Sequence, residues 1–192
     1  MAIIPMSQVS RRRGSTSFTC PRDPAQSQPH DQSQVTGNPK GGFLRQPYGF
    51  VQFTARVPSG SGLWSTLSTL PAKVSWPPET DIASVLGSEP GSARYCYHPI
   101  GTRHVVQVSS SAAGNRSKGW HTFAVNWESG SITWYTDGRQ AYRYLGVPPD
   151  VPMYLLADLV VENVYGSGPT SSGLSVPSLA IKNVKVYQSP VR

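Results

Sequence analysis

Turn residues divide this chain into short segments about ten residues apart, and this spacing constrains the fold more than any other feature. The 192 residues include 18 glycines and 18 prolines, and the segments between them are rich in Val, Thr and Tyr. Such segments favour strands over helices. No segment shows sustained helical periodicity, and none is apolar for long enough to cross a membrane. The sequence therefore predicts an all-β domain with a substantial core.

Ten segments are predicted to be strands, and the Asp137-Gly138 pair is typical of a tight hairpin turn between two of them. The predicted strands cover residues 48–57, 63–70, 79–86, 93–98, 103–109, 120–127, 131–136, 139–144, 152–161 and 178–188. Because they all follow Arg45, residues 46–192 are predicted to form one β-sandwich domain.

Residues 1–45 differ in composition from the rest of the chain. They contain six basic and two acidic residues, which supply +4 of the formal net charge of +7. They are rich in Ser, Gln and Pro and poor in apolar residues, so they are predicted to form an extended arm. An arm without a core of its own gains order by lying on the sheet edge of a neighbouring chain. We therefore expect a homo-oligomer or a subunit of a larger assembly.

The composition of residues 1–45 also indicates which partners and which cellular location to expect. Arg11, Arg12 and Arg13 could contact phosphates or could remain solvated. The arm lacks the interleaved aromatic residues that stack on bases, so nucleic acid is not the favoured partner. The apolar opening is too short for a secretory signal, and the arginines follow it rather than precede it. We expect the protein to be cytoplasmic until assembled, or to be part of a virion.

One predicted strand carries a pair of carboxylates. Residues 75–87 read SWPPETDIASVLG, so the strand is entered through two prolines. Alternation along a strand places Glu79 and Asp81 on one face and turns Ile82 and Val85 towards apolar surroundings. Retaining glycosidases use paired carboxyl groups about 5 Å apart on such a surface.

Five motifs in order resemble glycoside hydrolase family sixteen, which includes laminarinases, lichenases, agarases and carrageenases. Besides the Glu79 strand, they are YGFVQFTARVPSGSGLWSTLSTLP (48–71), HTFAVNWESGSITWYTDGRQAYR (121–143), PMYLLADLVVEN (152–163) and VPSLAIKNVKVYQ (176–188). The resemblance spans roughly residues 35–188. It implies a concanavalin-like jelly roll, which is a sandwich of two antiparallel sheets.

The resemblance assigns roles in the Glu79 strand. The family signature reads E-x-D-x-x-E on a bulged strand and E-x-D-x-E on a regular one. By position, Glu79 is the nucleophile and Asp81 is the assisting carboxylate. The acid/base glutamate is replaced by Ser84 in the bulged form or by Ala83 in the regular form. Neither side chain can protonate a leaving group, so Glu79 and Asp81 are predicted to be the vestigial part of a catalytically degenerate site.

Other family positions have also changed. A tryptophan that lines the family's sugar cleft is Ser68 here, and an asparagine of a late strand is Asp158. An aspartate that often holds a structural calcium in the family is Lys182. Because a cation cannot ligate a cation, no metal site is predicted, and no cofactor is implied.

Three residues are candidates for carbohydrate binding. Trp64 and Trp76 flank the Glu79 strand and could stack on a sugar ring, whereas Trp127 and Trp134 are expected to lie in the core. His121 occupies a position that faces the cleft in the family and could hydrogen-bond a carbohydrate. For His121, a purely structural role is an equal alternative.

The two cysteines, Cys20 and Cys96, leave alternatives open. They form no C-x-x-C pattern or Cys/His grouping, so a zinc site is not indicated. A disulfide between them would hold the arm to the sandwich, whereas a reducing compartment would leave both thiols free.

The sequence thus predicts a degenerate family-sixteen jelly roll that acts as a carbohydrate-binding or structural module. Its expected partner is a polysaccharide or surface glycan, and its expected setting is a larger assembly such as a phage virion. The alternative is an active retaining endo-β-glycanase with Glu79 as nucleophile and an acid/base supplied from elsewhere. A structural protein without any ligand is the third possibility.

Overall fold

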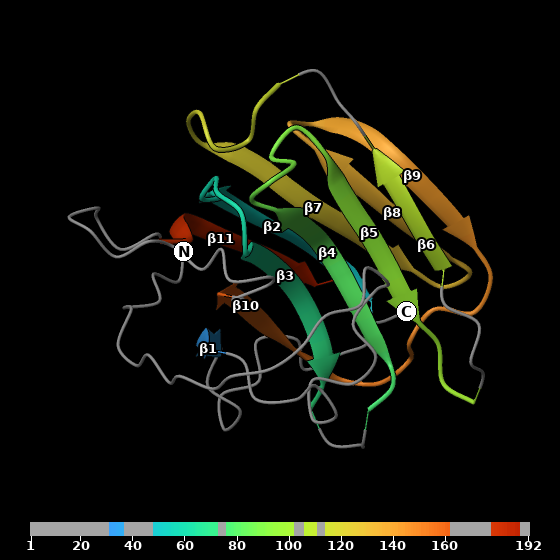
Figure 1. Ribbon diagram of the computed structural model, residues 1–192. Helices are drawn as coiled ribbons and strands as arrows, with labels where there is room; N and C mark the ends of the chain where they lie inside the picture. Colours follow the sequence, from blue (N-terminus) through green and yellow to red (C-terminus); the bar gives the residue numbers. More distant parts are fainter. Residues whose placement is uncertain are drawn as a thin grey trace.

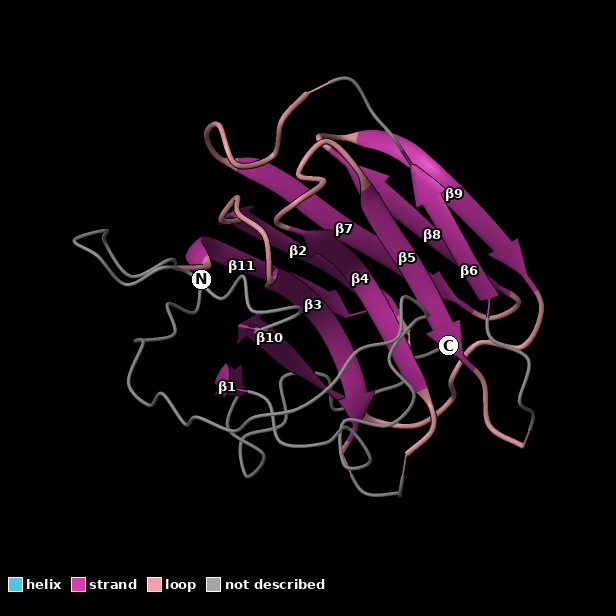
Figure 2. Ribbon diagram, in the orientation of Figure 1, coloured by secondary structure: helices cyan, strands magenta, loops and turns pink. Residues whose placement is uncertain are grey.

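The computed structural model describes residues 31–36, 48–72, 76–101, 106–110, 114–161 and 178–188. These residues form eleven strands, and no helix occurs among them (Figure 2). Accordingly, none of them belongs to a helix long and apolar enough to cross a membrane.

The strands build two antiparallel sheets. In chain order they are β1 (Asp31–Thr36), β2 (Gly49–Arg56), β3 (Leu63–Pro71), β4 (Glu79–Leu86), β5 (Ala93–His98), β6 (Val106–Ser110), β7 (His121–Glu128), β8 (Ser131–Thr136), β9 (Arg139–Leu145), β10 (Met153–Val161) and β11 (Ala180–Gln188). The six-stranded sheet has the order β1-β10-β3-β4-β5-β6, and the five-stranded sheet has the order β11-β2-β7-β8-β9. Figure 1 shows β3, β4 and β5 crossing in front of β2 and β7. The predicted all-β sandwich is confirmed.

The core lies between the two sheets and is built from alternate residues of each strand. In β2, Val51, Phe53 and Ala55 are buried while the residues between them are partly exposed. Trp127 and Trp134 are buried as expected, with 3% and 0% of their surfaces exposed. Burying a large apolar side chain stabilises a fold by roughly 1.5–3 kcal/mol, so these alternating rows hold the sheets together.

The hairpin between β8 and β9 has the predicted turn. Asp137 and Gly138 both have positive φ angles, of 51° and 74°. A two-residue type I′ turn requires positive φ at both central positions, and Asp-Gly is a favoured pair for it.

The strand β1 was not predicted from the sequence, whose first predicted strand begins at residue 48. Asp31 to Thr36 pair antiparallel with Val161 to Leu156 of β10. The segment DQSQVT contains one apolar residue, so alternation gave no signal. The strand forms because the edge of β10 offers unpaired backbone donors and acceptors. Residues 1–30 and 37–47 lie outside the described residues, so the expected intermolecular ordering of the arm stays a prediction.

Candidate functional site

A β-bulge in β4 determines which side chains share a face. Against β3, Leu67 pairs with Ala83, but the next residue, Ser68, pairs with Asp81. Against β5 the register shifts within the same part of β4, between Asp81 and Ser84. One extra residue on β4 therefore faces both neighbours, as a bulge requires.

The bulge decides between the two forms of the signature. With the extra residue accommodated, Glu79, Asp81 and Ser84 lie on one face of β4, while Ile82 and Val85 belong to the core. The strand therefore has the bulged form, in which the position that the resemblance assigns to the acid/base glutamate is Ser84 rather than Ala83.

This face of the six-stranded sheet points away from the five-stranded sheet, and we call it the carboxylate face. By register it carries Trp64, Thr66 and Ser68 of β3, Glu79, Asp81 and Ser84 of β4, Arg94, Cys96 and His98 of β5, and Tyr154 and Asp158 of β10. Of the six residues that the sequence proposed for the site, the structure brings five to this face. Trp64 lies on β3, Glu79, Asp81 and Ser84 lie on β4, and Trp76 reaches the face from the segment before β4.

Glu79 and Asp81 form a buried acidic pair. Glu79 is 3% exposed and Asp81 is fully buried. Burial, and then the charge of Glu79, raise the pKa of Asp81 well above its usual range. Two adjacent carboxyls in such surroundings cannot both ionise freely. The two carboxyls that the family resemblance assigns to the nucleophile and the assisting acid thus lie together on one buried face.

Trp76 fixes the position of Glu79. Its indole Nε1 donates a hydrogen bond to Glu79 Oε2 at 2.8 Å. Its ring packs on the His98 imidazole, with 5.5 Å between ring centroids. Burial lowers the pKa of His98 to about 4, so the imidazole is neutral at ordinary pH. Trp76 therefore orients the Glu79 carboxylate as well as offering an aromatic surface.

Trp64 hydrogen-bonds the hydroxyl of Ser84. Its indole Nε1 donates to Ser84 Oγ at 2.6 Å, and Ser84 is 2% exposed. A serine hydroxyl engaged in this way does not titrate near neutral pH and cannot act as the general acid. The position next to the acidic pair therefore lacks a proton donor.

Two residues of β10, Tyr154 and Asp158, also belong to the carboxylate face, although the sequence did not predict them as part of the site. Burial, and then the charge of Glu79, raise the pKa of Tyr154, so its phenol lies within the field of that carboxylate. Asp158 pairs with Thr66, which itself pairs with Ser84. The three residues thus form a row across β10, β3 and β4.

Asp158 is a buried carboxyl with an unused hydrogen-bonding atom. It is 8% exposed, and its Oδ1 has no hydrogen-bond partner. Burial raises its pKa to about 7, although a hydrogen bond from the Leu159 backbone acts in the opposite direction. The only signal in the sequence was its departure from the family's asparagine, because the register between strands cannot be read from one strand.

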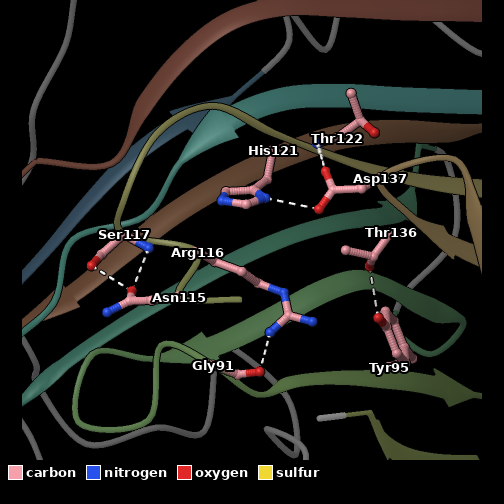
Figure 3. A network of polar contacts seen from close by, with 9 residues as sticks. All are labelled: Gly91, Tyr95, Asn115, Arg116, Ser117, His121, Thr122, Thr136 and Asp137. Carbon is pink, nitrogen blue, oxygen red and sulfur yellow. Dashed lines mark hydrogen bonds and ion pairs between the residues drawn. The ribbon is translucent and has the colours of Figure 1, made fainter. Parts of the chain in front are cut away.

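The structure does not bring His121 to the carboxylate face. His121 begins β7 in the five-stranded sheet, where it pairs with Ala55. Its Nδ1 lies 2.8 Å from Asp137 Oδ2, and Thr122 N–H donates to Asp137 Oδ1 at 2.9 Å (Figure 3). These contacts fix the β8–β9 turn and favour the structural role.

Arg116 lies in the same polar region as His121. Its guanidinium donates to the Gly91 carbonyl (Figure 3), and its backbone N–H donates to the Pro90 carbonyl at 2.9 Å. Arg116 is 2% exposed, so these contacts hold the loop before β7 to the turn before β5.

Cys96 lies opposite Asp81 on the carboxylate face. It is disulfide-bonded, so the alternative of two free thiols does not hold for this residue. The chain has one other cysteine, Cys20, which lies outside the described residues.

Comparisons with known proteins point in one direction. The family model described as glycosyl hydrolases family 16 matches residues 42–154, which is more than half of the chain. The endo-1,3-1,4-beta-glycanase EglC of Rhizobium meliloti (strain 1021) is 29% identical over 144 residues, covering 74% of this chain and 30% of that protein. The chain spans less than a third of the length of this relative and of two further curated relatives.

Solved structures share the fold. The laminarinase catalytic domain from Thermotoga maritima MSB8 has a TM-score of 0.67 and 22% identity, covering 84% of this chain and 70% of that one. A Glu-to-Ser mutant of SCLam, a non-specific endo-beta-1,3(4)-glucanase, has a TM-score of 0.66 and 18% identity, covering 83% and 66%. That mutant was co-crystallised with an oligosaccharide and presents a 1,3-beta-D-cellobiosyl-glucose at its active site.

Proposed function

This chain belongs to glycosyl hydrolases family 16, and we propose that it binds a β-glucan on the carboxylate face without hydrolysing it efficiently. The observation that carries the proposal is the serine at the acid/base position of the bulged strand. Ser84 shares the face with Glu79 and Asp81, and its hydroxyl is bound by Trp64.

The expected loss of catalysis follows from the retaining mechanism. That mechanism needs a proton donor about 5 Å from the nucleophile to protonate the departing oxygen. Removing general acid–base catalysis lowers the rate by about 10²–10⁴. Glu79 and Asp81 alone provide a nucleophile without an acid, so cleavage of a natural glycosidic bond should be very slow.

Serine at the acid/base position should affect sugar binding less than it affects catalysis. Trp64 and Trp76 supply aromatic surface beside the acidic pair, and Tyr154 adds a phenol close to Glu79. The SCLam structure gives support by analogy, because a glucanase of this fold with serine in place of a glutamate holds an oligosaccharide at its active site. The aromatic side chains and the SCLam structure are both consistent with a protein that binds a glucan but lacks the general acid needed to cleave it.

The cellular setting belongs to the same proposal. The excess positive charge of residues 1–45 supports a module attached to a larger assembly, and a virion that recognises a surface glycan is one such setting. The assembly would form through the arm, and deletion of residues 1–30 should then abolish co-assembly while leaving β1 in place.

The test compares binding with turnover. Wild-type protein should bind laminarin or lichenan in calorimetry and release no reducing sugar. Ser84→Glu should restore the carboxyl pair and gain turnover, whereas the matched control Ser84→Ala should not. Wild-type turnover that disappears in Glu79→Gln would contradict the proposal.

A second candidate function is favoured by Asp158. Ser68 pairs with Asp81 on one side and with Leu156 on the other, so Asp158 lies two strands and two residues from Asp81, roughly 12 Å between backbones. This separation is too large for the 5 Å of a retaining pair, whereas side chains that lean towards each other bring the carboxyls nearer to the roughly 6.5–9.5 Å of an inverting pair. A carboxyl with a pKa of about 7 is still partly protonated near neutral pH and could donate a proton.

The two candidates are distinguished by one isosteric change. If Asp158 supplies the acid, Asp158→Asn abolishes turnover, and NMR of fresh wild-type product shows the inverted anomer. If the binding proposal holds, wild type shows no turnover and Asp158→Asn leaves that result unchanged.

A further inference from the structure

The outer face of the five-stranded sheet carries aromatic side chains that the core does not explain. Tyr187 of β11 pairs with Phe50 of β2, and their ring centroids lie 6.1 Å apart. The Phe50 ring also lies 6.4 Å from the ring of Tyr135 in β8. We call these three residues the aromatic strip. Tyr187 is 59% exposed, although the solvent side of an antiparallel sheet is usually polar.

A small residue in the intervening strand makes the strip continuous. Between β2 and β8 lies β7, which contributes Ala124 opposite Tyr135 and Asn126 opposite Phe50. The small side chain of Ala124 leaves room for Tyr135 to reach Phe50 across the strand. The strip thus runs over four neighbouring strands, about 14 Å at 4.8 Å per spacing.

A second group on this side combines an exposed tryptophan with two cations, and we call it the cationic cluster. Trp120, just before β7, is 45% exposed. The Arg56 guanidinium and the Lys182 ammonium lie 5.6 Å and 5.8 Å from its ring centroid. Both distances are within the range of cation–π interactions. Lys182 sits at a register shift in β11, between Ile181 and Asn183.

Lys185 connects the two groups. It pairs with Gln52 and lies two residues from Tyr187, on the same face of β11. The positions Tyr187, Lys185 and Lys182 therefore follow one strand for about 16 Å, at roughly 3.3 Å per residue. Among the described residues, none of Arg56, Lys182 and Lys185 forms an ion pair with a carboxylate.

The acidic residues nearby are engaged elsewhere. Glu128 accepts a hydrogen bond from Asn126 at 2.9 Å, and Asp137 holds His121. The cations are thus available to an external anion. Protection of the β11 edge could explain the lysines, but it does not explain the aromatic strip.

We propose that the aromatic strip, Lys185 and the cationic cluster form a binding surface for an acidic polysaccharide. Flat aromatic rings stack on the C–H faces of sugar rings, and ammonium and guanidinium groups pair with carboxylate or sulfate groups. A length of about 16 Å fits an extended polymer better than a single sugar. A second copy of this chain is disfavoured, because it would bring like charges together.

The surface lies on the opposite side of the sandwich from the carboxylate face, since the two sheets pack through their other faces. Both surfaces can therefore be occupied at once. The inference is independent of the proposed β-glucan site, and failure of one leaves the other standing.

The test measures binding of polygalacturonate, a uronate polymer, by full-length protein in affinity electrophoresis. Tyr187→Ala should weaken binding about tenfold through the lost stacking surface. Lys185→Gln should weaken it about threefold, and added salt should weaken it further. The matched control Arg94→Gln makes the same change in net charge on the opposite face and should leave binding unchanged.

Three further probes identify the ligand chemistry. Dextran sulfate in place of polygalacturonate distinguishes sulfate from carboxylate recognition, and binding of either polymer that is lost in Tyr187→Ala supports the proposal. Equal binding by wild type, Tyr187→Ala and Lys185→Gln would overturn it. Tighter binding of poly(dT) than of both acidic polysaccharides, or competition by neutral laminarin, would also overturn it. Circular dichroism of each variant verifies that the sandwich is folded.

Discussion

The interior of the sandwich and the carboxylate face differ in which of their buried polar groups have hydrogen-bond partners. In the interior, Ser65 Oγ on the core side of β3 has no partner, but the polar tips of the large aromatic side chains do. Trp127 and Trp134 each donate to a backbone carbonyl at 2.8 Å, and the Tyr95 hydroxyl lies 2.7 Å from Thr136 Oγ1. These partners satisfy the hydrogen-bonding groups that burial removes from water.

On the carboxylate face, buried polar atoms remain without partners. They include Ser68 Oγ, His98 Nε2 and Asp158 Oδ1. An unsatisfied buried polar group costs about 1–3 kcal/mol, so this face is less stable than a packed apolar surface would be. The difference indicates that the interior maintains the fold, whereas the carboxylate face retains groups suited to a ligand.

The largest expected effect tests the interior. Trp134→Ala should lower the free energy of unfolding by about 3–5 kcal/mol, because it leaves a cavity and deprives the Asp81 carbonyl of its partner. Urea denaturation measures the change. A loss below about 1 kcal/mol would mean that the interior is not the stabilising region.

The disulfide is the feature of the carboxylate face that should stabilise strongly. We expect Cys20 to be the partner of Cys96, since it is the other cysteine of the chain. Cys96→Ser should then lower the free energy of unfolding by about 2–5 kcal/mol. A thiol assay on denatured, unreduced protein should detect no free thiol, and two free thiols per chain would contradict the pairing.

Asp158 should make stability depend on pH. Its pKa is about 7 in the folded protein and about 3.9 when unfolded, so between these values the folded state binds more protons. The free energy of unfolding should therefore fall as pH rises from about 4 to 7, by roughly 3 kcal/mol. Asp158→Asn should remove this contribution, as seen in unfolding curves at several pH values.

The comparison with Asp158→Asn also corrects for other titrating groups. Asp158 pairs with Thr66 on one neighbouring strand and with Gln34 on the other, and neither of these side chains titrates. The pKa of His98 is lowered to about 4, so His98 makes the free energy of unfolding rise with pH between about pH 4 and 6.5. This contribution is the same in wild type and in Asp158→Asn. Parallel pH profiles for wild type and Asp158→Asn would show that the Asp158 pKa is not raised.

The smallest expected effect concerns Ser68. Its hydroxyl is buried without a partner, so Ser68→Ala should leave stability unchanged or raise it by up to about 1 kcal/mol. Thr136→Val in the interior is the matched control, since it removes the partner of Tyr95 and should destabilise. A clear loss of stability in Ser68→Ala would remove the contrast between the two regions.

The sequence predicted most of the fold because its signals are local. Turn residues and alternation located ten strands, and Asp137-Gly138 located the hairpin. The strand β1 escaped because DQSQVT is polar, and its pairing is determined by the free edge of β10. Nothing in its own residues signals that edge.

The site was predicted less completely, because it depends on relations between strands. The sequence left Ser84 and Ala83 as alternatives, and the bulge against β3 and β5 selects Ser84. Asp158 joins the carboxylate face through its register with Thr66. His121 lies on the five-stranded sheet, apart from the carboxylate face, although it matches a family position in the sequence.

The most direct test of the account follows one oligosaccharide through binding. Wild-type protein is titrated with a defined β-1,3-glucan oligosaccharide while tryptophan fluorescence reports occupancy, and mass spectrometry then measures the length of the sugar. We expect saturable binding and an oligosaccharide that stays intact after prolonged incubation. Absence of binding, or binding with shortened products that Glu79→Gln prevents, would contradict the claim that this face holds a glucan it cannot cleave.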